Sequence, residues 1–400
     1  MDVIVIGAGP AGLYAAELLA EQGRRVLVLE AGARVGGRAH NEPFHGVEVE
    51  TGAGVGRWPH DRRLAAWLTK HGEKVTPTTC TLRYWKQGVG LVSPPMDVSK
   101  EARALPLPSD KDRRTLPFGA WLKATAGSAY AKEFILTASY DDYLRSDIVD
   151  ALEHYHFQDT APVTKIFTVH WTRFEGKVVK ALGALGVHLH LSEPVLTVRR
   201  GASGYDVTTD RGVYTAPRVV LAVPARPAVR LLARSGYQEN ATLLKQVRGQ
   251  PFVRAYVRFT GPENVVERNV GDEIVCAGPF RKVIQMDKDK RVYMVAYCDN
   301  THTRFWNRLQ RMPKRSAIAE VRTALTRLFG GTFSLDDLVI YAHRDATHYY
   351  TPLPEPYTTR QEFIHDAVHI DRGFTMIGEA VALNQGWTNS ALGTVSYLNL

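Results

Sequence analysis

A strand, a glycine-rich turn, a helix and a second strand open the chain, and this order constrains the fold more than any other feature. The run 3–6 is apolar and β-branched, as in a buried strand. Apolar residues then recur at helical spacing, and a second apolar run, 26–29, ends at Glu30. Between strand and helix lie glycines at G-x-G-x-x-G spacing: Gly7, Gly9 and Gly12. The order predicts a Rossmann-type β-α-β unit.

Each part of this unit has a task in binding a dinucleotide. The glycines allow a tight turn, close approach of the backbone to a pyrophosphate, and close packing of helix on strand. The helix start at Pro10 and Ala11 directs unpaired N–H groups at phosphate. Glu30, with Ala31 beside it, can accept hydrogen bonds from the ribose hydroxyls. An acid at this position favours FAD or NAD over NADP.

A second glycine pair follows Glu30 in the stretch EAGARVGGRAH. Gly36 and Gly37 let the backbone approach a cofactor, and Arg38 offers a charge-assisted fork to phosphate. Here the sequence resembles the flavin-containing amine oxidase superfamily, whose members carry a Glu, a short loop and then G-G-R on the FAD diphosphate. The resemblance implies FAD as the cofactor. It also implies cofactor contacts from the next segment, at Gly54, Val55, Gly56 and Arg57.

The resemblance resumes at 374–392, FTMIGEAVALNQGWTNSAL. In the family this strand ends in G-E, and the helix after the loop directs its positive end at the flavin, where reduction leaves negative charge. By resemblance, Glu379 holds a ribitol or phosphate hydroxyl, and Trp387 forms one aromatic wall in front of the flavin. A lone Trp is more often a core residue, and that alternative stays open. The other contacts implied here are Gly378, Thr388 and Ala391.

The segment YAHRDATHYYTPLPEPY lies where the resembled oxidases carry a second aromatic wall. Tyr349 and Tyr350 are the candidates. Two facing rings guide an amine toward the flavin and exclude water. Some family members link the flavin to a Cys beside this aromatic; here the neighbour is His348, so we expect non-covalent FAD.

Another departure concerns the strand FVRAYVRF, which enters the second domain. Many of the oxidases place a Lys there, linked to oxygen reactivity, and this chain has Arg254. Arg keeps a positive charge near the flavin but cannot act as a base. A V-x-x-V segment near the adenine in the family corresponds to Val195.

The resembled pieces imply an α/β fold with an interleaved chain. We expect a Rossmann-like FAD-binding domain from residues 1–75, 185–245 and 370–400. Residues 76–184 and 246–369 would form an α+β substrate domain on a mixed sheet. Within these we expect strands at Val195–Val198, Tyr205–Thr208 and Val219–Val223, and a helical stretch over 131–157.

Composition limits the environment and the partners. No apolar run approaches the ~20 residues of a membrane helix, and the first strand begins too early to leave room for a signal peptide. Three scattered cysteines indicate neither a disulfide framework nor a metal site, so we expect a reducing, cytosolic compartment. The net charge of +9 lies in mixed runs that read as solvated faces rather than as a nucleic-acid or membrane surface. A positive field attracts anions and does nothing to steer a cationic amine.

The resemblance implies an FAD-dependent amine oxidase acting on a small molecule. A hydride equivalent passes from the substrate to flavin N5, water hydrolyses the resulting imine, and O2 reoxidises the flavin to give H2O2. Two alternatives stay open. One is an FAD-dependent desaturase or isomerase of an apolar substrate; the other is a flavoprotein that binds FAD without turnover, because fold alone does not fix function.

Overall fold

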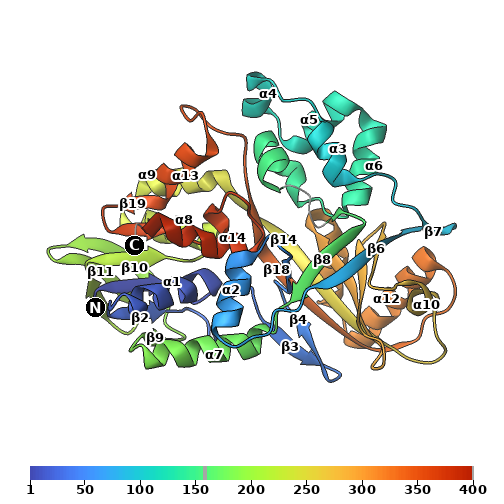
Figure 1. Cartoon of the computed structure of the whole chain (residues 1–400), viewed down its shortest axis with the longest axis horizontal. Helices are drawn as coiled ribbons and strands as arrows, with labels where there is room; N and C mark the ends of the chain where they lie inside the picture. The colour runs from blue at the N-terminus through green and yellow to red at the C-terminus, as the bar shows by residue number, and fades with distance from the viewer. Residues whose placement is uncertain (156–159, 399–400) are drawn as a thin grey trace.

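The computed structural model describes residues 1–155 and 160–398. Figure 1 shows two lobes, one around α1, α8 and α13 and the other around α10 and α12, with the helices α3 to α6 beside the second. Each lobe is built on its own β-sheet. The described residues include no helix that is long and apolar enough to cross a membrane.

The first lobe contains a six-stranded, mainly parallel sheet. β1 pairs in parallel with β2 and β13, β13 pairs in parallel with β20, and β19 is an antiparallel edge. The strands, in spatial order, are β19 (His369–Asp371), β20 (Phe374–Met376), β13 (Arg218–Leu221), β1 (Val3–Ile6), β2 (Val26–Leu29) and β9 (His188–His190). This is the Rossmann-like arrangement that the N-terminal motif predicts, and β1 and β2 have the predicted bounds.

Helices cover both faces of this sheet because its strands are apolar on both sides. Val3 and Val5 face one core, whereas Ile4 and Ile6 face the other, as a period of two requires. The first core holds α1 (Pro10–Glu21), α2 (Arg62–Lys70), α7 (Trp171–Ala184) and α14 (Thr388–Gly393). The second holds α8 (Ala225–Ser235), α9 (Gln238–Leu243) and α13 (Arg360–Val368).

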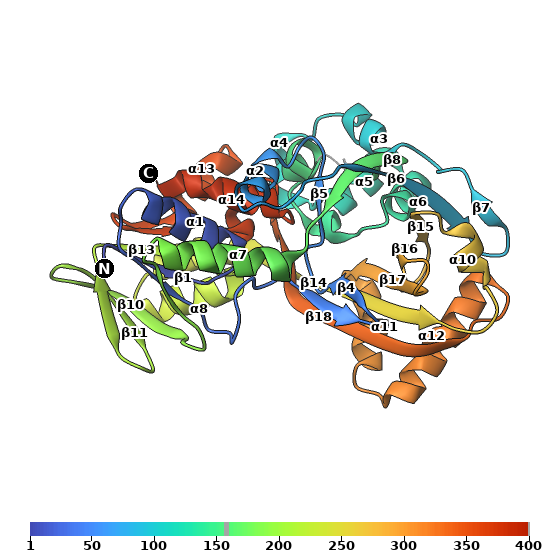
Figure 2. The same cartoon turned by 60° about the horizontal axis from the view of Figure 1, so that its bottom comes forward.

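The second lobe is built on a larger sheet that is mostly antiparallel. Its order is β18-β14-β17-β16-β15-β6-β8-β5, and β7 pairs with β6. The strands are β18 (Leu335–Tyr350), β14 (Val247–Phe259), β17 (Val292–Asp299), β16 (Lys282–Asp287), β15 (Glu273–Cys276), β6 (Thr78–Lys86), β8 (Val163–Thr168), β5 (Val55–Arg57) and β7 (Gly90–Val92). Figure 2 shows β14 and β18 running together from the junction of the lobes along this sheet.

Helices flank the larger sheet as well. One apolar core joins it to α10 (Val265–Asn269), α11 (Thr303–Leu309) and α12 (Lys314–Phe329). A separate apolar core lies within the helical segment that stands beside this lobe. The helices of that segment are α3 (Val98–Ala104), α4 (Asp110–Thr115), α5 (Phe118–Ala126) and α6 (Ser128–Ala138). The hairpin formed by β3 (Asn41–Phe44) and β4 (Val47–Glu50) lies near the junction of the lobes.

One expected element needs correction. The helix expected over 131–157 ends at Ala138, because Ser139 takes φ 58° and the Asp141 amide donates to Asp299 across the junction with β17. A 3₁₀ helix follows at Asp142–Arg145 and a π-helix at Asp150–Tyr155, and residues 156–157 lie outside the described residues.

The three strands expected within 195–223 are present, with ends that differ by up to three residues from those expected. β10 (Val195–Gly201), β11 (Gly204–Thr209) and an unpredicted β12 (Val213–Ala216) form an antiparallel meander, whereas β13 leaves it to join β1. Helix α7 was also unpredicted. It packs on α1, which argues for placing 171–184 with the first lobe; the wider domain boundaries stay a prediction.

Candidate functional site

A cleft of about 440 Å³ lies where the first sheet meets β14 and β17. The ends of β1 and β2 open into it, as do the Gly37-Arg38 loop and the start of α14. The structure brings together in its wall these residues expected to bind cofactor or substrate: Gly7, Gly9, Pro10, Ala11, Glu30, Ala31, Gly37, Arg38, Gly54, Val55, Val195, Arg254, Gly378, Glu379, Trp387, Thr388 and Ala391.

The glycines of the turn shape the cleft floor in different ways. A Cβ at Gly12 would stand 2.0 Å from the Gly7 carbonyl oxygen, and Gly7 has φ +104°, so both positions require glycine for packing and turn geometry. At Gly9 a Cβ would meet no atom within 4 Å. A side chain there would therefore project into free space, and its absence leaves room for a pyrophosphate beside the helix N-terminus.

Glu30 stands at the end of β2 with its carboxylate ordered by the backbone. Oε2 accepts from the Ala8 amide at 2.8 Å and Oε1 from the Gly32 amide at 2.7 Å. Each oxygen keeps a further lone pair, and the residue lines the cleft. The side chain is thus held ready to accept two hydroxyl groups, and the residues present fit a dinucleotide.

Glu379 joins three segments that are remote in sequence. Its oxygens accept four bonds: from Arg38 Nη1 at 2.7 Å, His348 Nδ1 at 2.6 Å, the His348 amide at 2.9 Å and the Gly386 amide at 2.9 Å. Burial opposes ionisation, but His348 and Arg38 hold the pKa of Glu379 well below its usual range. Since its oxygens are already engaged, the ribitol contact stays a prediction, and the observed role is to position the loops.

Trp387 lines the cleft with Arg57 stacked on one face of its ring. The Arg57 guanidinium lies 3.8 Å from the ring centroid, and Nη2 donates to Asp61 at 2.9 Å. Arg57 is not among the residues that line the cleft, whereas the sequence analysis expected it to contact the cofactor. It fixes the orientation of the indole. Gly56 does not line the cleft either. It packs against Phe167, so that a Cβ at this position would stand 2.2 Å from the ring.

Gly36 has a conformational role and does not line the cleft. It has φ +92°, and a Cβ would stand 1.9 Å from Glu175 Oε1. That Glu175 oxygen is buried without a hydrogen-bond partner, and burial raises the pKa of Glu175 to about 8. The G-G-R loop is thus held against helix α7 rather than being a free surface loop.

The structure does not bring Tyr349 or Tyr350 to Trp387, so the expected second aromatic wall does not hold. Tyr350 is buried in the core and donates to the Ala382 carbonyl at 3.2 Å, and Tyr349 borders a small separate cavity. Ala346 and Thr347 line the cleft instead.

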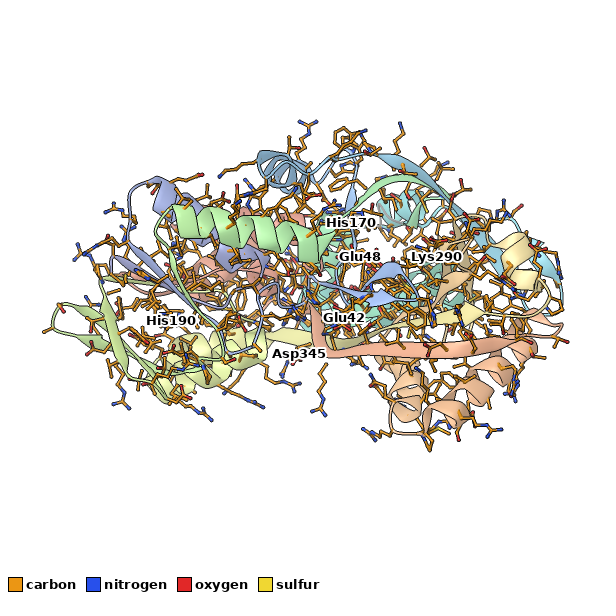
Figure 3. All side chains as sticks on the ribbon, turned by 90° about the horizontal axis from the view of Figure 1, so that it is seen from below. Glu42, Glu48, His170, His190, Lys290 and Asp345 are labelled. Atoms are coloured by element: carbon orange, nitrogen blue, oxygen red, sulfur yellow. The ribbon has the colours of Figure 1, made fainter. Side chains whose placement is uncertain are left out.

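The reason for this difference is a bulge in β18. Gln250 pairs with Thr347 but Phe252 pairs with His343, so 344–346 face a single residue of β14. Figure 3 labels Asp345, which lies at this bulge between the two lobes. The extra residues change which side chains of β18 reach the cleft.

The aromatic side of the cleft is built from residues that the sequence analysis missed. Phe252 on β14 and Tyr297 on β17 line it, with ring centroids 4.7 Å apart in an edge-on arrangement. His343 also lines it and bonds through Nε2 to the Thr51 carbonyl at 2.7 Å. The alternation of side chains along β14 from Arg254 could have indicated Phe252; no sequence signal places Tyr297 beside it.

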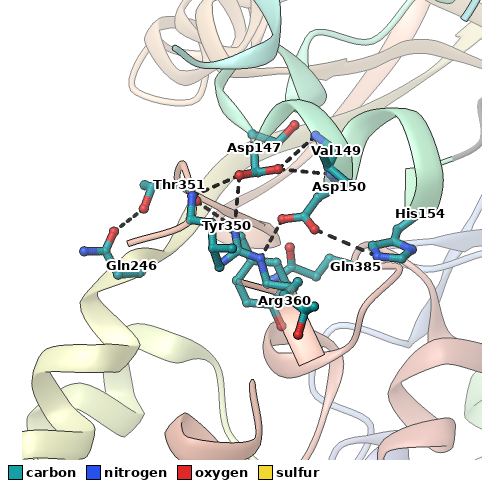
Figure 4. Close-up of polar contacts among 12 residues, drawn as sticks. Asp147, Val149, Asp150, His154, Gln246, Tyr350, Thr351, Arg360 and Gln385 are labelled. Atoms are coloured by element: carbon teal, nitrogen blue, oxygen red, sulfur yellow. Dashed lines mark hydrogen bonds and ion pairs between the residues drawn. The ribbon is translucent and has the colours of Figure 1, made fainter. Parts of the chain in front are cut away.

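A charged cluster outside the cleft fastens the segment after Asp147 to the end of β18 (Figure 4). Arg360 donates to Asp150 at 2.7 Å, and Asp147 accepts from the Leu353 amide at 2.9 Å. Burial raises the pKa of Asp150 to about 7 even though Arg360 favours its charged form. These partners bind one another, so we assign the cluster a structural role.

The fold is Rossmann-like, and the residues of the cleft fit a dinucleotide. Family models make the class specific: one for a NAD(P)-binding Rossmann-like domain matches residues 5–70, and one for flavin containing amine oxidoreductase matches residues 175–394. The chain belongs to the flavin containing amine oxidoreductase family, which implies a flavin cofactor and a flavin-dependent enzyme.

Individual relatives agree with this assignment. The chain is 47% identical over 73 residues to putrescine oxidase of Kocuria rosea, which is 18% of this chain and 15% of that protein. It is 24% identical over 269 residues to pseudooxynicotine dehydrogenase of a Pseudomonas species, covering 56% of this chain and 51% of that protein. A structure of wild-type putrescine oxidase bound to putrescine matches with a TM-score of 0.72 at 17% identity, over 98% of this chain and 97% of that one. At this identity the structural match shows the shared fold.

Proposed function

We propose that the protein binds FAD non-covalently and oxidises the C–N bond of an amine. The observation that carries this proposal is the position of Trp387: an indole held by Arg57 enters the same cleft as the glycine turn and Glu30. An aromatic ring beside a flavin can orient a small substrate and exclude water. The match to the amine oxidoreductase model supports the same reaction class.

The residues of the cleft have separate tasks in this proposal. Glu30 and the turn at Gly9 would hold the ribose and pyrophosphate, while Arg38 lies beside the cleft with Glu379 fixing its guanidinium. Trp387 would orient the amine. Bound FAD would supply the acceptor for the hydride that leaves the C–H bond next to the amine nitrogen, with O2 as the final electron acceptor. Water would then hydrolyse the imine. The compartment that we propose for the protein is the cytosol.

Arg254 favours a second candidate, a flavin enzyme without useful oxygen turnover. It occupies the strand position at which the resembled oxidases carry a Lys linked to oxygen reactivity, and it cannot donate a proton reversibly near neutral pH. A desaturase or isomerase of an apolar substrate would fit this difference and the aromatic walls of Phe252 and Tyr297.

The purified protein is expected to be yellow and to release FAD on acid extraction, because the glycine turn, Glu30 and the Gly37-Arg38 loop all line one cleft. Anaerobic addition of a panel of amines should bleach the flavin, and admission of air should restore its colour. The visible spectrum follows both steps. Colourless protein that takes up no FAD would end the proposal. Bleaching that air does not reverse would favour the second candidate.

Glu30→Ala is expected to weaken FAD binding at least about tenfold while leaving reduction per bound flavin unchanged. The variant loses charged acceptors for ribose hydroxyls, and each such bond is worth about 1.5–3 kcal/mol. Titration of apoprotein with FAD measures the change. Glu21→Ala on helix α1 is the control, because Glu21 pairs with Lys70 on the surface. Equal FAD affinity in the two variants would show that Glu30 does not contact the cofactor.

A further inference from the structure

Arg254 is a buried cation whose hydrogen-bonding capacity is only partly met by the protein. It lies in the middle of β14 and is 5% exposed, yet it lines the cleft. Nε has no hydrogen-bond partner, and Nη1 is 4.0 Å from the sulfur of Met294. A guanidinium carries five N–H donors, and leaving buried donors unpaired is costly. The side chain is therefore arranged for a partner outside the chain.

Glu50 does not supply that partner. Its Oε2 lies 3.7 Å from Arg254 Nη1, beyond hydrogen-bond distance. The same oxygen accepts from the Tyr256 hydroxyl at 3.2 Å, and that hydroxyl also donates to the Glu50 carbonyl at 2.7 Å. Glu50 thus offsets part of the charge through space. Glu50 forms an ion pair with Arg254 but no hydrogen bond, so the planar fork of Arg254 has no bidentate carboxylate partner.

The other charged groups of the described cleft are already paired. Arg38 bonds to Glu379, and Glu30 accepts from backbone amides. Burial, together with Arg38 and Arg254, lowers the pKa of His343 and so disfavours its charged form. Among the described residues that line the cleft, Arg254 is the cation without a carboxylate at hydrogen-bond distance.

Aromatic rings hold the guanidinium in place. Its central carbon lies 4.5 Å from the ring centroid of Tyr297 and 5.9 Å from that of Phe252. Such contacts orient an Arg while leaving its N–H edge available. They also make the surroundings of the charge apolar, which strengthens an interaction with a bound anion.

We propose that Arg254 is an anion-binding residue of the cleft, and that its partner is either an oxygen of a substrate carboxylate or an oxygen of the flavin ring that takes up negative charge on reduction. The inference rests on the proposed flavin site but not on amine oxidation. It agrees with the net charge of +9, which attracts anions rather than amines. Arg254 would then select for acidic substrates or hold the flavin electrostatically.

The test compares benzoate with benzyl alcohol, a neutral ligand of similar size, as probes of the purified holoprotein. Binding is followed by perturbation of the flavin spectrum. The wild type should bind benzoate at least about tenfold more tightly than benzyl alcohol, as expected for a charged hydrogen bond. Arg254→Gln should abolish the preference, Arg254→Lys should retain part of it, and Arg248→Gln, an exposed position on the same strand, should retain it fully.

Two further measurements separate the sources of the anion. If the partner is the flavin, Arg254→Gln lowers the flavin midpoint potential, and the wild type binds benzoate no more tightly than benzyl alcohol. If Arg254→Gln does not fold, Arg254→Lys carries both measurements, because it keeps the charge opposite Glu50. Unchanged benzoate preference and unchanged potential in the folded Arg254 variants would overturn the inference. If the protein binds benzoate selectively but its flavin is not reduced by any amine tested, the inference about Arg254 stands and the proposed amine oxidation is rejected.

Discussion

Glu379→Gln is expected to destabilise the holoprotein by about 3–5 kcal/mol, the cost of removing one partner of a buried ion pair. The variant leaves the Arg38 guanidinium without its carboxylate and disturbs the bonds to His348 and Gly386. Since these groups belong to three remote segments, cofactor retention should fall together with stability. Chemical denaturation monitored by flavin and tryptophan fluorescence measures both.

A surface ion pair provides the matched control. Glu21→Gln removes the partner of exposed Lys70 and should cost less than about 1 kcal/mol. The lowered pKa of Glu379 also predicts the sign of a pH effect: its stabilising contribution is present above pH 4.5 and is lost as the pH falls below that value. Glu379→Gln should lack this part of the acid sensitivity. Equal stability of the two variants at neutral pH would show that the four bonds of Glu379 do not hold the site together.

Trp387→Ala is expected to retain FAD but to slow flavin reduction by substrate on the order of a hundredfold. The proposed dinucleotide contacts are made by the glycine turn and Glu30 rather than by the indole, and misplaced reactants cost a rate factor of this size. Loss of the Arg57 stack should lower stability only modestly. Stopped-flow reduction under anaerobic conditions, with a melting curve on the same sample, gives the two quantities.

Trp67→Ala supplies the contrasting core variant. Trp67 is 3% exposed and packs on Phe174, so its truncation should cost about 3–5 kcal/mol. Its flavin should nevertheless be reduced at the normal rate per bound cofactor. If Trp387→Ala behaved like Trp67→Ala, Trp387 would be a core residue and the main residue-level argument for an amine-oxidising site would fail.

The parts of the fold that the sequence predicted are those set by local pattern. β1, α1 and β2 follow from an apolar period and glycine spacing, and Glu30 follows from the end of the second strand. Helix α7 begins at Trp171 after an N-cap residue, His170, that makes no side-chain cap, and it was missed although its buried residues recur at helical spacing. Such a helix is stabilised mainly by packing on α1, which sequence pattern alone does not show.

In the candidate site, too, some residues could be predicted from local sequence pattern, whereas other features depend on tertiary structure. Arg254 and Trp387 could be placed by counting from a strand and from the G-E pair. The bulge that excludes Tyr349 and Tyr350 depends on how β14 and β18 pair, and register is a tertiary property. The stack of Arg57 on Trp387 joins β5 to the start of α14 and has no local signal. The unmet donors of Arg254 likewise required the positions of neighbouring strands.

The strand order of the first sheet has a consequence for how the protein is made. β13 pairs through Val219 with both Ile4 and Phe374, so three remote parts of the chain must meet before this sheet is complete. Closing such long loops is entropically costly and slows folding. A nascent chain that has not yet exposed β20 also lacks Glu379 and Trp387. We therefore expect cofactor capture to follow synthesis of the C-terminal strands, and shortage of flavin during expression to leave late intermediates exposed to aggregation.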